Sequence, residues 1–391
     1  MKKGWQTKTI GDVCEVIAGQ SPEGKFYNAE GKGMPFYQGK KDFGDKFIEA
    51  PTTWTTQTTK IAKEGDILMS VRAPVGPVNF ATDEVCIGRG LAAIRSSDEL
   101  NRDFLFYQLW HLQPEIAGRE GAVFASINKA EIEALPLAFA PLAEQQRIVG
   151  LLDEAFEGLA TAKANAEKNL QNARALFESH LQSVFTQRGP GWVEKAIGEL
   201  CERLHQGLNT AGEKVKFYES GYPIIQTRNI DDGVVELDSK MKFMSEEDWQ
   251  LYKDKYRPEI GDVFFTNIGT IGKTAIVTTD RDYLIHWNIF KLRPLLGKIT
   301  SEFLRYTLEQ LTLSGYFEKL QKGGTVDFVT KKMISEALIL LPPIAEQKTI
   351  VAKLDDLREE TKRLARLYER KHAALEALKK SLLHQAFTGA L

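Results

Sequence analysis

The chain has 391 residues, of which 43% are apolar and 27% charged, so it is large enough for several domains and too apolar for wholesale disorder. Its 51 Lys and Arg residues nearly balance its 53 Asp and Glu residues, which excludes a bulk basic surface for nucleic acid. Three cysteines without zinc-site or disulfide spacing favour a reducing, cytoplasmic setting, and no apolar run is long enough to span a membrane.

In chain order, the first 140 residues predict a mixed α/β domain. A β-rich run over residues 66–71 ends at a turn over 73–77 with two prolines and a glycine, and a second run follows, which predicts a hairpin. We expect an amphipathic helix over 104–110. Residues 188–342 repeat this order, with a run over 261–266, a turn over 269–272 and a helix over 303–311. A second domain of the same kind is therefore predicted.

Each domain is followed by a segment that predicts one long helix, over 141–187 and 343–391. Apolar residues recur there at spacings of three and four, and about 40 helical residues would extend roughly 60 Å. One seven-residue frame, the pattern of a coiled-coil seam, is followed by Ile350, Leu354, Leu357, Leu364, Tyr368, Leu375, Leu378 and Leu382. We expect the two helices to pair antiparallel; packing of each helix on its own domain is the alternative.

The two helical segments are copies of each other. At an offset of 202, residues 141–153 and 343–355 share eight identities in thirteen positions, and the match continues without a gap to Thr186 and Thr388. At an offset of 187, Trp5 and Cys14 match Trp192 and Cys201. The sequence therefore predicts an internal two-fold repeat in the order domain, helix, domain, helix.

Signals for catalysis are weak. Residues 269–274, Gly-Thr-Ile-Gly-Lys-Thr, resemble the end of a phosphate-binding loop, but the first glycine of that pattern would fall at Asn267. The six histidines show no metal-ligand spacing, and no glycine-rich cofactor loop precedes a helix. We expect no catalytic residue, metal or cofactor in this chain.

Two divergent domains that alternate with two nearly identical helices, each beginning Pro-[Leu/Ile]-Ala-Glu-Gln, closely resemble the specificity (S) subunit of type I restriction-modification enzymes, the HsdS family. Supporting motifs are Trp-x-x-x-x-Ile-Gly-[Asp/Glu]-[Val/Leu]-Cys at 5–14 and 192–201, and Gln-Thr-Arg-Asn-Ile at 226–230. The resemblance covers the whole chain. It implies two target-recognition domains, 1–140 and 188–342, separated by two long antiparallel helices, 141–187 and 343–391, that form a coiled coil and act as spacers.

The resemblance also implies a non-catalytic DNA reader. Each domain would bind one half of a split, asymmetric site in double-stranded DNA, with the half-sites about one helical turn, roughly 34 Å, apart. Two methyltransferase (M) subunits, which carry S-adenosylmethionine, would dock on the helices, and restriction (R) subunits would join through the complex. No membrane contact is implied. Because the charge is balanced, we expect the isolated chain to bind DNA only modestly.

Base contacts are expected in turns where the repeat keeps its frame but changes its residues, because two different half-sites would be read there. Arg72 could take both acceptors of guanine, and Asn267 could pair with adenine. Lys129 and Lys331 agree between the repeats and suit phosphates. The DNA-binding residues predicted in the first domain are Gln38, Lys40, Lys41, Ser70, Arg72, Arg89, Ser126 and Lys129. Those predicted in the second are Gln226, Arg228, Asn229, Thr266, Asn267, Thr270, Lys273, Trp287, Asn288, Thr325 and Lys331. The alternative for each is a solvated turn residue or a structural hydrogen bond.

Four residues of the helix-start motif, Glu144, Gln145, Glu346 and Gln347, fall in a first helical turn, where a carboxylate complements the helix dipole. Capping alone explains them, or they form the surface met by the methyltransferase subunits, as the resemblance implies. A second hypothesis for the whole chain is a coiled-coil scaffold whose domains bind protein and not DNA. It fits the balanced charge, but it does not explain a helical spacer copied at fixed length.

Overall fold

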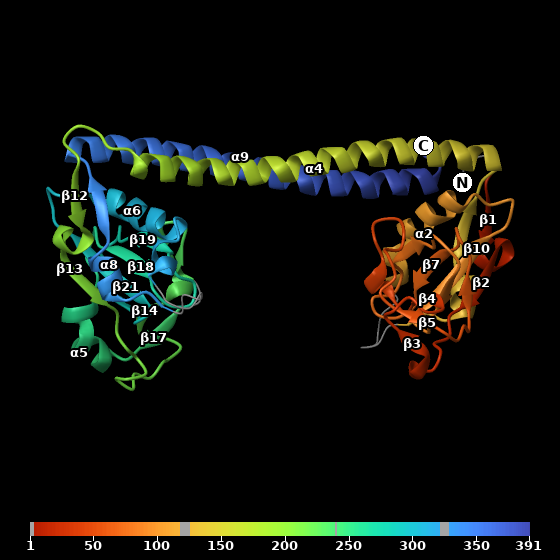
Figure 1. The fold of residues 1–391 in the computed structure, drawn as a ribbon, viewed down its shortest axis with the longest axis horizontal. Coiled ribbons are helices and arrows are strands. Elements are labelled where there is room, and N and C mark those ends of the chain that lie inside the picture. Colours follow the sequence, from red (N-terminus) through yellow and green to blue (C-terminus); the bar gives the residue numbers. More distant parts are fainter. Residues whose placement is uncertain (1–3, 118–125, 239–240, 321–327) are drawn as a thin grey trace. The chain divides into compact units, whose positions relative to one another are not determined.

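The computed structural model describes residues 4–117, 126–238, 241–320 and 328–391. The chain divides into two compact units: unit 1 contains residues 1–167 and 370–391, and unit 2 contains residues 168–369. Two helices of 45 residues each, α4 (Leu142–Thr186) and α9 (Ile344–Thr388), continue from one unit into the other (Figure 1). Each unit therefore holds half of both long helices.

Unit 1 is built on a four-stranded antiparallel sheet in the order β2-β10-β7-β8. Its strands are β2 (Cys14–Ala18), β7 (Ile67–Ser70), β8 (Val78–Phe80) and β10 (Leu91–Ser96). A second, five-stranded sheet has the order β3-β5-β4-β9-β6. Its strands are β3 (Tyr27–Asn28), β4 (Met34–Tyr37), β5 (Trp54–Thr55), β6 (Ile61–Ala62) and β9 (Val85–Ile87). Strands β7 and β8 form the hairpin that the sequence predicted.

The four-stranded sheet of unit 1 is buried on both faces, and its side chains alternate between two cores. Ile67 and Met69 pack in the core that includes α2 (Arg102–Ala117) and the long helices, whereas Leu68 packs against the five-stranded sheet. Figure 1 shows α2 between this sheet and the long helices. The remaining elements of unit 1 are β1 (Gln6–Thr9), which pairs with β11 (Pro136–Phe139), and the short helices α1 (Ile10–Val13) and α3 (Lys129–Glu133).

Unit 2 repeats this plan. Its four-stranded sheet, β13-β21-β18-β19, is covered by α6 (Ser301–Leu313), and β14 pairs in parallel with β20 as β4 does with β9. The strands are β12 (Val193–Ala196), β13 (Cys201–Gln206), β14 (Tyr222–Ile225), β17 (Lys242–Met244), β18 (Val263–Thr266), β19 (Thr274–Ile276), β20 (Leu284–Ile285), β21 (Ile289–Pro294) and β22 (Leu338–Leu341). Helix α8 (Lys331–Ser335) corresponds to α3, whereas β15 (Ile230–Asp231), β16 (Val234–Val235), α5 (Glu246–Tyr256) and α7 (Tyr316–Lys319) are elements of unit 2.

A buried carboxylate is repeated at the start of the central hairpin in both units. Asp66 accepts two hydrogen bonds from Arg95, and Asp262 accepts two from Arg293, at 2.8 to 3.0 Å. In unit 2 a buried lysine, Lys291, adds a second positive charge 4.0 Å from Asp262. These pairs fix the two hairpins in the same way.

The long helices run antiparallel within each unit, as the sequence predicted. In unit 1, Lys163 pairs with Glu376 at 3.0 Å and Arg147 donates to the carbonyl oxygen of Leu391. In unit 2, the C-terminal half of α4 and the N-terminal half of α9 share one core with α6. The helices therefore pack both on each other and on the domains, so the two arrangements that the sequence left open are combined.

Candidate nucleic-acid interface

Three segments meet in unit 1 and form one junction: residues 70–73 at the end of β7, 88–90 between β9 and β10, and 126–129 at the start of α3. The Val71 amide donates to the Gly90 carbonyl at 3.0 Å, and the Ile127 amide donates to the Val71 carbonyl at 3.1 Å. Arg72 and Ser126 form an isolated β-bridge. Main-chain hydrogen bonds therefore fix three segments that are distant in the sequence.

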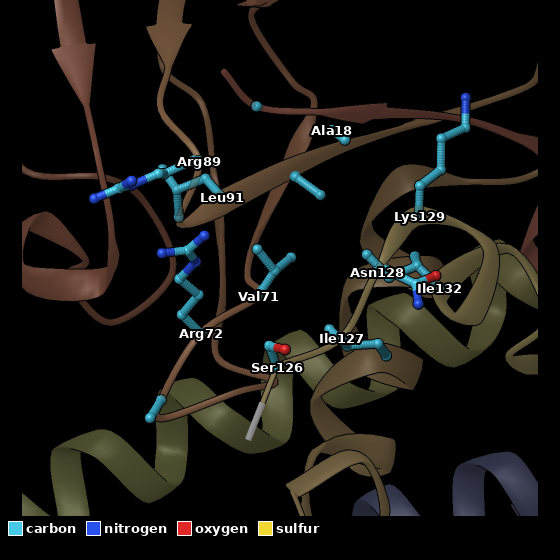
Figure 2. A pocket seen from close by; sticks show the side chains of 13 residues that line it. Ala18, Val71, Arg72, Arg89, Leu91, Ser126, Ile127, Asn128, Lys129 and Ile132 are labelled. Carbon is cyan, nitrogen blue, oxygen red and sulfur yellow. The ribbon is translucent and has the colours of Figure 1, made fainter. Parts of the chain in front are cut away.

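This junction borders a hollow of about 590 Å³ that gathers four of the predicted DNA-binding residues (Figure 2). Arg72 and Arg89 lie together on one side of the hollow, Lys129 lies on the other, and Ser126 lies at its base in that view. All four are exposed. Among the described residues, neither arginine has an ion-pair partner, so both guanidinium groups can donate to a ligand.

A glycine allows the close packing of this junction. The Gly19 amide donates to the Leu91 carbonyl at 2.9 Å, and a Cβ atom on Gly19 would lie 2.2 Å from the Gly88 carbonyl oxygen. Ser21 then accepts a hydrogen bond from the Arg89 amide at 3.1 Å. We did not predict Gly19 or Ser21, although Gly207 in unit 2 makes the same approach and the repeated glycine was a usable signal.

Unit 2 has the same junction. The Asn267 amide donates to the Asn288 carbonyl at 3.1 Å, the Val329 amide donates to the Asn267 carbonyl at 2.9 Å, and Ile268 bridges Phe328. These bonds match those of Val71, Gly90, Ile127, Arg72 and Ser126, which confirms the predicted correspondence of the loops. The backbone is repeated while the side chains change.

A fourth loop lies beside each junction. The Gly88 amide donates to Tyr37 at the end of β4, and the His286 amide donates to Ile225 at the end of β14, both at 2.8 Å. The predicted residues of these loops that are exposed are Gln38, Lys40, Lys41 and Arg228, whereas Gln226 is half-buried. These side chains stay candidates for DNA contacts.

Four of the predicted base-contacting residues are buried, and their predicted roles do not fit the structure. Ser70 donates to the Arg72 carbonyl, and Thr266 accepts from the Lys273 amide, so both hydroxyls stabilise the turn after a strand. Asn229 accepts from the Gln226 amide, and Asn267 is only 1% exposed. Asn267 was the preferred adenine reader, but it corresponds to Val71, whose side chain packs on the core of unit 1.

The other predicted residues of unit 2 occupy varied environments. Thr270 and Lys331 are exposed, and Trp287 is 36% exposed. Lys273 already has partners within the domain, because its ammonium donates to the Ile230 carbonyl and pairs with Asp231 at 3.1 Å. Thr325 lies outside the described residues, as does the part of the 122–129 loop before Ser126.

Asn288 lies in a polar chain that the sequence did not reveal. Its Oδ1 atom is 2.9 Å from His286 Nδ1, and His286 Nε2 is 3.1 Å from the Thr210 hydroxyl. Because the amide oxygen only accepts, Nδ1 carries the proton and Nε2 accepts from Thr210. Burial lowers the pKa of His286, which favours this neutral form.

The helix-start glutamines are structural, so the prediction that they bind a partner is wrong. Gln145 and Gln347 are 0% exposed. Gln145 accepts from the Asn101 amide and donates to the Glu99 and Ala140 carbonyls, at 2.8 to 3.1 Å. Gln347 makes the same three bonds to unit 2, at 2.9 to 3.0 Å. Each glutamine locks a long helix to its domain, whereas Glu144 and Glu346 stay half-buried at the surface.

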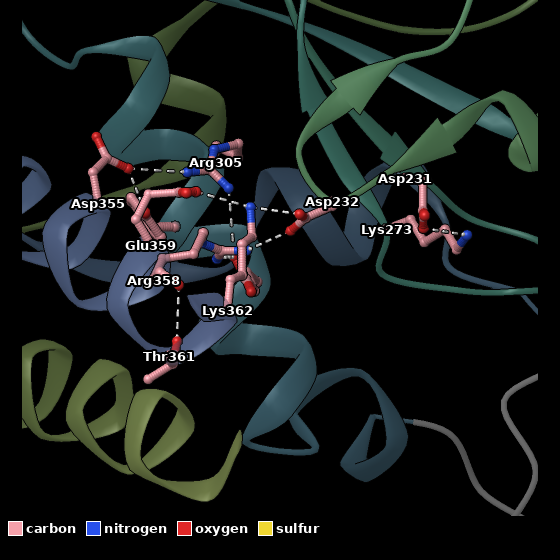
Figure 3. A network of polar contacts seen from close by, with 11 residues as sticks. Asp231, Asp232, Lys273, Arg305, Asp355, Arg358, Glu359, Thr361 and Lys362 are labelled. Atoms are coloured by element: carbon pink, nitrogen blue, oxygen red, sulfur yellow. Dashed lines mark hydrogen bonds and ion pairs between the residues drawn. The ribbon is translucent and has the colours of Figure 1, made fainter. Parts of the chain in front are cut away.

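An ionic network also joins α9 to its domain in unit 2 (Figure 3). Asp232 contacts Arg358 at 3.5 Å and Lys362 at 2.5 Å, and Arg358 contacts Glu309 at 2.5 Å. The residue corresponding to Arg358 in unit 1 is Phe156, which packs in an apolar core. At this position the two domains are thus attached to the long helices by different chemistry.

Other kinds of site receive no support from the described part of the chain. Residue Thr274 begins strand β19, so the glycine-rich turn before it joins two strands and lacks the helix of a phosphate-binding loop. Within the described ranges, no group of three or more His, Cys, Asp or Glu side chains could hold a metal ion. No described helix is long and apolar enough to cross a bilayer.

Comparison with known proteins is consistent with this geometry, which defines a protein made of two copies of one recognition fold on paired helices. Residues 2–170 and 190–369 match the family model described as type I restriction modification DNA specificity domain, and the chain belongs to that family. The resemblance seen in the sequence is thereby confirmed.

The chain is 39% identical over 174 residues to a Methanocaldococcus jannaschii protein named for the MjaX type I restriction enzyme specificity subunit; the match covers 44% of this chain and 40% of that protein. It is 23% identical over 320 residues to the type I restriction enzyme EcoBI specificity subunit of Escherichia coli, covering 75% of this chain and 66% of that protein. Among solved structures, a chain from work on complex assembly and conformational transition of the type I R-M system aligns with a TM-score of 0.83 at 20% identity, covering 100% of this chain and 99% of the other. The structural match supports the predicted fold.

Proposed function

We propose that the chain is the DNA-specificity subunit of a type I restriction-modification complex and that each domain reads one half of a split site in double-stranded DNA. The observation that carries this proposal is the repeated loop junction, in which the same main-chain hydrogen bonds present different exposed side chains. A pair of readers for two unlike half-sites needs a common frame with exchangeable contacts. A protein-binding scaffold gives no reason for this pattern, and family membership does not favour it.

In this proposal the chain recognises DNA and the chemistry belongs to other subunits. Lys129 and Lys331 begin α3 and α8 at corresponding, exposed positions and are proposed to contact phosphates. The half-sites are proposed to lie about one helical turn apart on the DNA, with the long helices as the spacer. Adenine methylation is proposed to occur in methyltransferase subunits that bind S-adenosylmethionine, and restriction subunits are proposed to join through the same complex.

Two methyltransferase subunits are proposed because the helices carry a duplicated exposed surface. Leu176 is 53% exposed and its copy, Leu378, is 47% exposed. Identical exposed neighbours extend the same helix face, because positions 175, 176, 179 and 186 fall within about one quadrant at 100° per residue. These pairs are Ala175 and Ala377, Ser179 and Ser381, and Thr186 and Thr388. Two equal surfaces in one chain suit two copies of one partner.

The first experiment is to co-express the chain with the methyltransferase subunit from its source and map adenine methylation across the host genome. We expect a split motif that changes on one side when residues 1–140 are exchanged and on the other side when residues 188–342 are exchanged. A folded chain that forms no complex and gives no motif would overturn the proposal.

The duplicated surface has its own test in the same system. We expect L176E and L378E each to reduce the number of methyltransferase subunits bound per chain, measured by native mass spectrometry. The matched control is L151E, because Leu151 is 43% exposed and its counterpart in the second repeat is already a charged residue, Lys353. Equal binding by L151E, L176E and L378E would refute the assignment of this surface.

A further inference from the structure

The two junctions present opposite chemistry at corresponding positions. The shared hydrogen bonds and bridges place Ile268 where unit 1 has Arg72, and Phe328 where unit 1 has Ser126. In the third loop, Trp287 corresponds to Arg89, because the His286–Ile289 and Gly88–Leu91 turns make the same 3.0 Å hydrogen bond. Two cations and a hydroxyl in unit 1 are thus replaced by three apolar side chains in unit 2.

The junction of unit 1 suits a guanine. Each guanidinium group has a planar fork of donors that matches the O6 and N7 acceptors in the major groove. Arg72 and Arg89 come from two different loops and lie together at one side of the hollow (Figure 2). Because the Arg89 amide is held by Ser21, its position on the loop is fixed before any ligand arrives.

The junction of unit 2 suits a thymine. Trp287 and Phe328 are 36% and 50% exposed, and Ile268 is half-buried. The Trp287 loop is rigid, because the Trp287 amide donates to Leu208 at 3.0 Å and its carbonyl accepts from Gln206 at 2.7 Å. The C5 methyl of thymine is the apolar group that the major groove offers to such a surface.

We propose that unit 1 reads a half-site with an essential guanine through Arg72 and Arg89, and that unit 2 reads a half-site with an essential thymine whose methyl group packs on Ile268, Trp287 and Phe328. The inference rests on the proposed function. DNA is the occupant favoured for the apolar surface because the corresponding surface of unit 1 is cationic and because the same lysine, Lys129 or Lys331, flanks both. A protein partner would have no reason to prefer the loops that the repeat varies.

The test uses modified duplexes with the complex of this chain and its methyltransferase subunits. Once methylation mapping has defined the target, each thymine of one half-site is replaced by deoxyuridine, which removes only the methyl group. Each guanine is replaced by 7-deazaguanine, in which C–H replaces N7 and that one acceptor is lost. We expect deoxyuridine to weaken binding about fourfold at one position of the half-site read by residues 188–342, since a buried methyl contributes that factor. We expect 7-deazaguanine to weaken binding roughly five- to tenfold in the other half-site.

Variants link each effect to its side chain. W287A should bind the thymine and deoxyuridine duplexes equally, and R72Q should lose its sensitivity to 7-deazaguanine. The matched control is L296A, because Leu296 is 97% exposed. It lies in the turn after β21, where Lys298 accepts a hydrogen bond from Gln347, whereas Trp287 lies before β21. This variant should keep the full deoxyuridine effect.

Three results would overturn the inference. The first is a first half-site without guanine, since both arginines are assigned to that base. The second is an unmodified protein whose binding is unaffected by deoxyuridine, a result that needs no variant to fold. The third is a W287A chain that loses its methyltransferase subunits, which would show that the apolar surface contacts protein. Absence of any split motif would instead refute the proposed function itself.

Discussion

The locking glutamine of each helix gives the sharpest stability prediction. Replacing Gln347 by Ala removes three hydrogen bonds and leaves the Thr300 amide and the Lys298 and Pro342 carbonyls without that partner, in a place where the side chain is fully buried. At about 1 to 1.5 kcal/mol for each of the three groups, the loss should be about 3 to 4.5 kcal/mol. For a unit of this size that corresponds to a decrease of roughly 10 °C in the melting temperature of unit 2.

The measurement is thermal unfolding, combined with hydrogen exchange to identify the unit that opens. Q347A should accelerate exchange at the start of α6, whereas Q145A should accelerate it at the start of α2 and leave unit 2 unchanged. The control is Q146A, because Gln146 is the exposed neighbour of the buried Gln145 at the start of α4. If Q347A costs no more stability than Q146A, the glutamine is not a lock and the reasoning fails.

Three further predictions concern buried or half-buried ionisable groups. D262N should destabilise its unit by about 3 to 5 kcal/mol in denaturant titrations, and by more than D66N, because Asp262 also faces the buried Lys291; equal losses would contradict this account. Burial lowers the pKa of His286 below its ordinary 6.5, so its stabilising effect is complete above that value and is lost as the pH falls through the folded pKa. The H286Q variant should therefore lose less stability than the unmodified protein between about pH 7.5 and 5, and an identical pH profile would refute the assignment. Burial raises the pKa of Cys201 to about 12, so this thiol should resist iodoacetamide at about pH 8 in the native protein and be labelled once unfolded, as followed by peptide mass spectrometry that separates it from Cys14 and Cys86; rapid native labelling of Cys201 would show an exposed thiolate.

The repeat let the sequence predict the long helices, the hairpins and the correspondence of the loops, because matched frames survive even where residues differ. The seam was predicted less well. Leu378 fits the seven-residue frame but is 47% exposed, whereas Val351, outside that frame, is only 9% exposed. A helix that packs on a partner helix and on a domain buries more than one stripe, so a single period cannot describe it.

Individual site residues were predicted least well, for a related reason. Whether a turn residue points to solvent or into the core depends on the local backbone conformation, which the sequence does not specify. Arg72 is exposed, whereas Asn267, one position earlier in the corresponding turn, is buried. The apolar surface of unit 2 was missed because Ile268 and Phe328 look like core residues in the sequence. The hydrogen bonds of the junction show which residues of the two units correspond, and the structure shows which of their side chains are exposed.

The glutamine locks carry an evolutionary consequence. A domain in either half of the chain meets the same anchors: a buried glutamine in the first turn of the following helix, and an aspartate eight residues later that accepts a bond from Tyr107 or Tyr306. Recombination between the two repeats would therefore exchange a complete domain and leave these two anchors unaltered. Both halves of the chain therefore offer the same two anchors to a domain. New target preferences can be acquired by exchange of whole domains, without changes in the anchor residues of the long helices.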